Sequence, residues 1–482
     1  MAETLKEKTA KGLFWGGVSS GVSQVLNLVF GIFLARMLSQ SDYGMVGMLS
    51  IFSALAGVFQ EGGFISALNR KKDVTHNDYN AVFWTSIIVS FTMYVLLFIS
   101  APYIASFYGV PKLSPLARYI FIGFFITSIS VAPKAYLFRN MMVRENAIIT
   151  FSSISASGVL ALCMAYNGFA YWGIATQYTL YAAIVTILNF YFSHWRPSFR
   201  VDFSPIREMF GFSSKLMITG VFNIINANVF SVVLGKMYTP HVVGDFTQAN
   251  KWSNLGGSLI GGMLGGVAQP VFAKTNEDKE RQKQVLRKLL RFTALISFPS
   301  MFGLALVSQE FIVILLTKKW LESANLMQFL CVGGAFAPLS AIFSNLLVSR
   351  GHSTTNMWSI IMLCVVQLGV VVIAAPYGII KMVVASVIIN VLWFFVWHYL
   401  TRVEVDIHIG EVIKDISPYF LLSATLAMIA YLTSVYIENL YLRFVVKVFV
   451  VASLYPFILW RLKSTIFFEM IEFFTHYKQK QR

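Results

Sequence analysis

Charged residues are scarce in this sequence of 482 residues, at 12% of the chain, against about 25% in soluble domains. Apolar residues make up 57%, above the roughly 45–50% of soluble domains. This composition excludes an ordinary soluble protein. The segments on the side of the membrane opposite the N-terminus are also short and poor in Asp and Glu, whereas a membrane enzyme needs a sizeable loop that carries catalytic acids.

Residues that bind metals and cofactors are lacking too. The three cysteines lie inside apolar segments without a CxxC spacing, which favours packing over a disulfide or a metal site: Cys163, Cys331 and Cys364. The seven histidines are scattered without ligand spacing. The glycine-rich segment 256–266 lacks the GxxxxGK(S/T) pattern of a nucleotide-binding loop. We therefore expect no catalytic residue, no metal and no cofactor.

The net charge of +16 does not indicate a nucleic-acid partner, because Lys and Arg occur in short loops between apolar segments. If the N-terminus lies in the cytoplasm, 27 of the 38 Lys and Arg residues fall on the cytoplasmic side, 8 on the other side and 3 within spans. This positive-inside bias predicts an even number of spans and two cytoplasmic termini. The first apolar run lacks an A-x-A cleavage site, so we expect a spanning helix there and not a signal peptide.

Apolar runs of about 20 residues, the length that a helix needs to cross a bilayer, recur along the whole chain. The sequence predicts an all-α integral membrane protein with about 14 transmembrane helices. They cover residues 12–35, 43–66, 80–102, 116–137, 146–166, 170–192, 211–235, 243–271, 289–308, 323–348, 354–374, 378–400, 416–436 and 442–460. The segment 310–320 is too short to cross and is expected to form an interfacial helix.

An internal repeat links the two halves at an offset of 200. Residues 30–44 read FGIFLARMLSQSDYG and residues 230–244 read FSVVLGKMYTPHVVG, so Phe30 matches Phe230 and Gly44 matches Gly244. The repeat predicts a six-helix bundle in residues 1–200 and a second in 201–402. Residues 403–482 then add two transmembrane helices and a cytoplasmic tail. Parallel repeats of this kind enclose a central cavity in many secondary transporters.

Polar side chains recur at helical spacing in the first two helices of each repeat. They include Gln24 and Asn27 in the first span, Asn223 and Asn226 in the seventh, and Asn254 in the eighth. We interpret these rows as the lining of a hydrophilic cavity between the halves. The alternative is that such side chains only bond neighbouring helices, at about 0.6 kcal/mol each.

Charged residues within spans are costly, at roughly 2.5–3.5 kcal/mol, and they tend to face cavities. Lys251 lies well inside the eighth span and is expected to bind an anionic ligand. Lys215 either shares that role or extends to the cytoplasmic surface. Arg36 and Lys236 lie at matching span ends, where they anchor the helix or gate the outer mouth. Glu61 binds a coupling ion, pairs with a cavity lysine or lies among headgroups.

Several short segments, taken in order, resemble one known family. They are residues 33–38 with 42–44, 212–216, 234–236, 243–244, 269–272 with 278–281, and 319–320. Their order and spacing from about residue 8 to 460 are similar to the polysaccharide transporters of the multidrug/oligosaccharidyl-lipid/polysaccharide (MOP) exporter superfamily. The chain resembles the Wzx-like flippases of O-antigen units in particular.

This resemblance implies a flippase that moves an undecaprenyl-diphosphate-linked oligosaccharide across the bacterial cytoplasmic (inner) membrane by alternating access. The substrate would be a unit of O-antigen, capsule or exopolysaccharide. Lys251 and Lys215 would be the cations for the diphosphate, with Arg36 and Lys236 on the outer side. Membrane lipid, H⁺ or Na⁺, and the polysaccharide polymerase with its chain-length machinery are the other implied partners.

Two alternatives remain open. A cation-coupled drug exporter of the same superfamily is expected to have more aromatic and acidic lining and usually only twelve spans. A membrane enzyme of polysaccharide synthesis is the less favoured alternative, because its catalytic loop is lacking.

Overall fold

The computed structural model describes the backbone of residues 5–65, 68, 71, 73–276, 278–470 and 472. Within these ranges, some side chains are not described, namely those of residues 5–20, 208, 212, 215, 216, 259, 263–267, 269, 270 and 274. The described part of the chain is helical and contains no strand. The prediction of an all-α protein is therefore confirmed.

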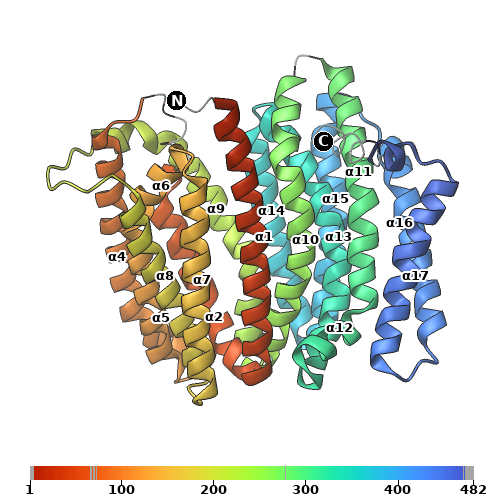
Figure 1. Ribbon diagram of the computed structural model, residues 1–482, viewed down its shortest axis with the longest axis horizontal. Helices are drawn as coiled ribbons and strands as arrows, with labels where there is room; N and C mark the ends of the chain where they lie inside the picture. The colour runs from red at the N-terminus through yellow and green to blue at the C-terminus, as the bar shows by residue number, and fades with distance from the viewer. Residues whose placement is uncertain are drawn as a thin grey trace. The chain divides into compact units, whose positions relative to one another are not determined.

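Many of the helices are joined by only a few residues, whereas residues 193–203 form a longer connection between α8 and α9 (Figure 1). The earlier helices are α1 (Leu5–Met37), α2 (Gln40–Glu61), α4 (His76–Tyr108), α5 (Leu113–Ser128), α6 (Val131–Arg139), α7 (Val143–Tyr166), α8 (Tyr171–Phe192) and α9 (Ser204–Met237). The later ones are α10 (Pro240–Lys274), α11 (Lys279–Leu306), α12 (Ser308–Leu316), α13 (Leu321–Ser349), α14 (Ser353–Ala374), α15 (Ile379–Val405), α16 (Ile409–Ser434) and α17 (Leu440–Arg461).

Ten helices in the described residues are long and apolar enough to cross a membrane, or up to 11 if the bent pair α5 and α6 counts as one span. The protein is thus a multi-pass membrane protein. The other three of the 14 predicted spans fall on α1, α8 and α10. In α1, side chains are described only from residue 21 onward, and this described part, Gly21–Met37, is an apolar helix. The count of about 14 therefore stays a prediction.

The predicted span 116–137 is broken into two helices that meet at an angle of 44°. Pro133, in the first turn of α6, has no N–H for the carbonyl of Ile129, and its ring obstructs a continuous helix. The backbone N–H of Ser130 bonds to Thr127 O at 3.0 Å, and its hydroxyl bonds to the same oxygen at 2.8 Å. These tighter bonds end α5 two residues before α6 begins.

The chain forms two compact units, residues 1–244 and 245–482. In the first unit, α7 packs against α1 and α8, α4 packs against α5, and α2 packs against α9. In the second, α11 packs against α13 and α16, and α13 packs against α15. The domain boundaries inferred from the repeat, at 200/201 and 402/403, stay a prediction.

Two ion clusters join α16 and α17 to the rest of the second unit. Near one end of α11, Arg287 Nε lies 2.7 Å from the buried carboxylate of Asp415 on α16. Near its other end, Glu310 of α12 is fully buried and lies 2.8 Å from Lys447 Nζ on α17. Buried carboxylates require such partners, because an unpaired charge away from water is strongly destabilising. Ion pairs thus attach α16 and α17, the helices that the sequence predicts to lie outside the repeat.

Gly44 of α2 lies against the start of α10, and the matched Gly244 of α10 lies against the start of α2. A Cβ built on Gly44 would lie 1.7 Å from the carbonyl oxygen of Pro240, and one built on Gly244 would lie 1.9 Å from that of Gln40. Gln40 and Pro240 are themselves matched at the offset of 200. The start of α2 and the start of α10 therefore cross in a reciprocal contact of the kind that two-fold symmetry produces.

Candidate functional site

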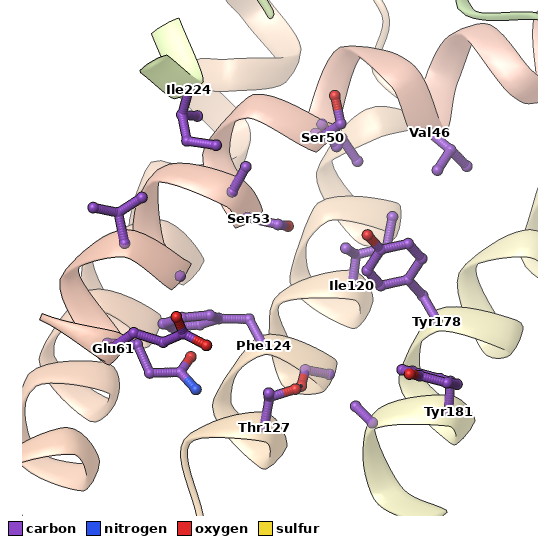
Figure 2. A pocket seen from close by; sticks show the side chains of 17 residues that line it. Val46, Ser50, Ser53, Glu61, Ile120, Phe124, Thr127, Tyr178, Tyr181 and Ile224 are labelled. Carbon is purple, nitrogen blue, oxygen red and sulfur yellow. The ribbon is translucent and has the colours of Figure 1, made fainter. Parts of the chain in front are cut away.

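A pocket of about 460 Å³ lies within the first unit, between α2, α5 and α8, with one residue from α9 (Figure 2). Its volume falls in the range of about 300–1,000 Å³ that is typical of small-molecule sites. In Figure 2, Tyr178 and Tyr181 extend from α8, Phe124 and Thr127 come from α5, and Glu61 lies at the end of α2. The lining is thus aromatic on one side and carries polar groups on another.

The α2 side of this pocket carries hydroxyl groups one turn apart. Ser50 Oγ donates to Gly47 O at 2.7 Å and lies 3.1 Å from Asn228 Oδ1 of α9. Ser53 Oγ is buried and has no hydrogen-bond partner among the described residues. Gly57 follows on the same helix, and a Cβ built there would meet no atom within 4 Å. The pocket therefore offers open space beside an unused hydrogen-bonding group.

Glu61 pairs with Lys134, whose Nζ lies 3.2 Å from Glu61 Oε1. Both side chains are about half exposed, at 52% and 53%. The acid lies at the carboxyl end of α2, where a negative charge is unfavourable to the helix dipole, so a cation is the expected neighbour. Lys134 belongs to α6, and the sequence alone indicates only a cytoplasmic cation at this position. The predicted role of Glu61 in ion coupling stays a prediction.

In the second unit, Lys251 of α10 is half-buried, and its Nζ lies 6.0 Å from the ring centroid of Trp252. Among the side chains that the structure describes, no carboxylate pairs with this ammonium group. One turn earlier, the Gln248 amide is fully buried, and neither its nitrogen nor its oxygen has a partner in the described residues. Asn254, one turn later, is exposed and donates to Asn250 Oδ1 at 3.1 Å.

The other predicted polar residues lie on α1 and α9, outside the pocket of the first unit. Gln24, Asn27 and Asn223 are exposed, and Asn226 is half-buried. Lys215 lies in α9, but its side chain is outside the described set. Of the predicted site residues, Glu61 lines the pocket together with Tyr178 and Tyr181. The five residues on α1 and α9 do not line it.

The two cations that are predicted to lie on the outer side occupy the last turns of their helices. Arg36 is exposed in the last turn of α1, and Lys236 occupies the last turn of α9. Lys236 Nζ donates to the carbonyl of Phe107 at 2.8 Å and lies 4.8 Å from the centroid of its ring. A cation is favourable beside the carbonyl end of a helix, which explains an anchoring role. A gating role stays a prediction.

No three His, Cys, Asp or Glu side chains in the described part of the chain are close enough together to hold a metal ion. The polar groups of the pocket and of the Lys251 region are hydroxyls, amides, one exposed ion pair and one half-buried lysine. Such groups bind and orient a ligand through hydrogen bonds and charge.

The arrangement of helices defines a class of protein. A structure of the lipid II flippase MurJ in an inward closed conformation superimposes with a TM-score of 0.74 at 15% identity, over 92% of this chain and 98% of that chain. An inward-facing multidrug resistance MATE transporter of the MOP superfamily gives 0.64 at 17% identity, over 80% of this chain and 94% of that chain. The fold is therefore that of the MOP-superfamily transporters.

Sequence comparison gives the family. The chain belongs to the polysaccharide biosynthesis protein family, whose model matches residues 33–325. The lipopolysaccharide biosynthesis protein WzxC of Escherichia coli is 24% identical over 72% of this chain and 71% of its own length. The teichuronic acid biosynthesis protein TuaB of Bacillus subtilis is 23% identical over 90% of this chain and 91% of its own length. The resemblance to polysaccharide transporters is thus confirmed.

Proposed function

We propose that this chain is a flippase that moves an undecaprenyl-diphosphate-linked oligosaccharide from the cytoplasmic to the outer leaflet of the bacterial inner membrane. The observation that carries the proposal is Lys251, a half-buried cation on an apolar helix for which no described carboxylate is a partner. Membership of the polysaccharide biosynthesis protein family and the MOP-superfamily fold support it. Both termini lie in the cytoplasm.

The proposed chemistry is binding without bond cleavage. A diphosphate cannot enter hydrocarbon alone, and a buried lysine is itself costly, at roughly 2.5–3.5 kcal/mol, until an anion neutralises it. Lys251 and Lys215 would bind the diphosphate, while Gln24, Asn27, Asn223, Asn226 and Asn254 would bond the headgroup. Arg36 and Lys236 would act at the outer mouth. The lipid tail stays in the bilayer while the two repeats alternate around the headgroup.

Export of surface polysaccharide in the native host tests this proposal. In a host that lacks the gene, Lys251→Ala should fail to restore export, and the lipid-linked unit should accumulate on the cytoplasmic side. Loss of one charge-assisted contact of about 1.5–3 kcal/mol corresponds to a roughly 10- to 100-fold decrease. The matched control is Lys381→Ala, because Lys381 is an exposed lysine near the start of α15. Normal export by Lys251→Ala would contradict the assignment.

A cation-coupled drug exporter is the second candidate, and the fold shared with a MATE transporter favours it. The same deletion host separates the two functions. Unchanged surface glycan together with raised sensitivity to cationic drugs would favour the exporter. In that case Glu61, as an exchangeable acid beside a pocket, would be the first residue to test for H⁺ or Na⁺ coupling.

A further inference from the structure

The side chains around the pocket of the first unit carry no net charge. The second unit differs, because Lys251 gives it a half-buried positive charge. Glu61 and Lys134 neutralise each other at 3.2 Å, and no other ionisable acid or base among the described residues lines the pocket apart from two tyrosines. A diphosphate would find no unpaired cation here. The pocket therefore fits a neutral part of an amphiphilic substrate.

The two tyrosines present aromatic surface to this pocket. Tyr181 follows Tyr178 by three positions on α8, so the two side chains lie on one face of the helix. They are 62% and 37% exposed, so most of one ring and a good part of the other remain uncovered. Figure 2 shows both rings beside the space that Ser53 and Glu61 border from α2. An aromatic face packs well against a flat apolar partner.

The opposite wall supplies hydrogen-bonding groups. Ser53 Oγ is buried without a described partner, Ser50 lies one turn before it, and the half-exposed carboxylate of Glu61 lies at the end of the same helix. An alkyl chain would leave Ser53 Oγ without a partner and would desolvate the half-exposed carboxylate of Glu61, and both effects are unfavourable. The lining therefore selects a ligand that is flat and apolar on its faces but rich in hydroxyls at its edges.

We propose that this pocket binds a pyranose unit of the transported glycan. The C–H face of the sugar stacks on Tyr178 and Tyr181, while its hydroxyls bond to Ser50, Ser53 and Glu61. This inference rests on the proposed function and adds to it a site for the sugar within the first unit.

Direct binding of a soluble sugar tests the inference independently of transport. The probe is the repeat-unit oligosaccharide released from the host's own surface polysaccharide, titrated into the full-length protein in nanodiscs. Nanodiscs avoid sugar-based detergents, which would compete. We expect saturable binding by the wild type and by Lys251→Ala, because the soluble probe carries no diphosphate. Absence of binding by the wild type would overturn the inference and leave the export test of Lys251 unaffected.

Two variants probe the pocket from opposite walls. Tyr178→Ala removes a stacking surface and should weaken binding about five- to tenfold, whereas Tyr178→Phe keeps the ring and should restore most of it. Gly57→Leu places a side chain into open space and should block the pocket without removing a contact. Because leucine is a better helix former than glycine, this variant is expected to fold.

Matched controls lie on the same helices or in similar surroundings outside the pocket. Tyr191 is a 74% exposed tyrosine on α8, and Gly211 of α9 has no atom within 4 Å of a built Cβ. Tyr191→Ala and Gly211→Leu should bind the oligosaccharide like the wild type. Wild-type affinity in Gly57→Leu or Tyr178→Ala would overturn the inference. So would competition by a simple alkyl chain, because that result would identify a lipid-tail groove.

Discussion

The second helix of each predicted repeat, α2 and α10, shares some polar and glycine positions but not its charges. At the offset of 200, Ser53 matches Ser253 and Gly57 matches Gly257, while Ser50 is replaced by Asn250. Lys251, in contrast, matches Ile51, which is buried. Glu61 matches Gly261. Two hydrogen-bonding positions and one glycine are thus shared by the two copies. Lys251 and Glu61 each occur in one copy only, and Asn254 is a further difference because it matches Ala54.

The two copies of this helix therefore differ in the ligand chemistry that each suits. A neutral polar wall in the first copy suits sugar, and an added cation in the second suits phosphate. The ion pairs of the two units differ in a similar way. Glu61 and Lys134 are half exposed beside a pocket, whereas Glu310 and Lys447 are buried and join α12 to α17. One pair is available to a ligand, and the other is structural.

The largest effect is expected at the buried pair. Glu310→Ala would leave Lys447 as an uncompensated buried charge and should destabilise the protein by about 3–5 kcal/mol. The readout is the thermal unfolding temperature of the purified protein. A double variant, Glu310→Ala with Lys447→Met, removes the two buried charges. It leaves Arg443, the second partner of Glu310, whose side chain is 30% exposed to water, so much of the loss should be recovered. Equal unfolding temperatures for wild type and Glu310→Ala would contradict a structural role for this pair.

The crossing of the repeats should be nearly as sensitive. Gly44→Ala and Gly244→Ala each place a Cβ very close to a carbonyl oxygen, at 1.7 and 1.9 Å. Each should destabilise the fold by about 1–3 kcal/mol, the usual range for overpacking. Because the two sites share one crossing, we expect the double variant to lose less than the sum of the single losses.

The next glycines in the two copies are the controls for this crossing. A Cβ built on Gly57 or Gly257 meets no atom within 4 Å. Alanine at either position should therefore be neutral or slightly stabilising, by up to about 1 kcal/mol, through its better helix propensity. If Gly44→Ala melts like Gly57→Ala, the reciprocal contact inferred from the repeat is wrong.

The sequence is most informative where the chain repeats itself. The match of Gly44 with Gly244 predicts related halves, and the structure brings these two positions together through Gln40 and Pro240. The long apolar runs likewise predict the helical, multi-pass fold. Both signals are local patterns of residue type. Long apolar runs favour membrane-spanning helices, and glycine allows two backbones to approach closely.

Contacts between distant residues are not predictable in this way. Lys134 lies 73 positions from Glu61, and only the bend between α5 and α6 places it on a separate short helix. Pro133 is the available signal for that bend, but proline also occurs inside unbroken helices of this protein, such as Pro102 in α4. The apolar pattern assigns Tyr178 and Tyr181 to a plain span. Their spacing of three residues is the signal that could have indicated a shared face.

The smallest effect on stability is expected at the half-exposed ion pair of Glu61 and Lys134. Its variants test whether it differs from the buried pair of Glu310 and Lys447. Glu61→Gln and Lys134→Gln each break a pair whose side chains are about half exposed. Water screens such charges, so each change should alter the free energy of unfolding by less than about 1 kcal/mol. The unfolding temperature should thus stay close to that of the wild type, unlike that of Glu310→Ala.

Oligosaccharide binding should distinguish Glu61→Gln from Lys134→Gln, because the two changes affect the pocket differently. Glu61→Gln keeps the shape of the side chain but weakens its hydrogen bonds to sugar hydroxyls, since bonds to charged groups are about twice as strong as neutral ones. Lys134→Gln leaves the carboxylate in place and should affect binding less. A large loss of stability in Glu61→Gln, or equal loss of binding in both variants, would mean that this pair is structural, like that of Glu310 and Lys447.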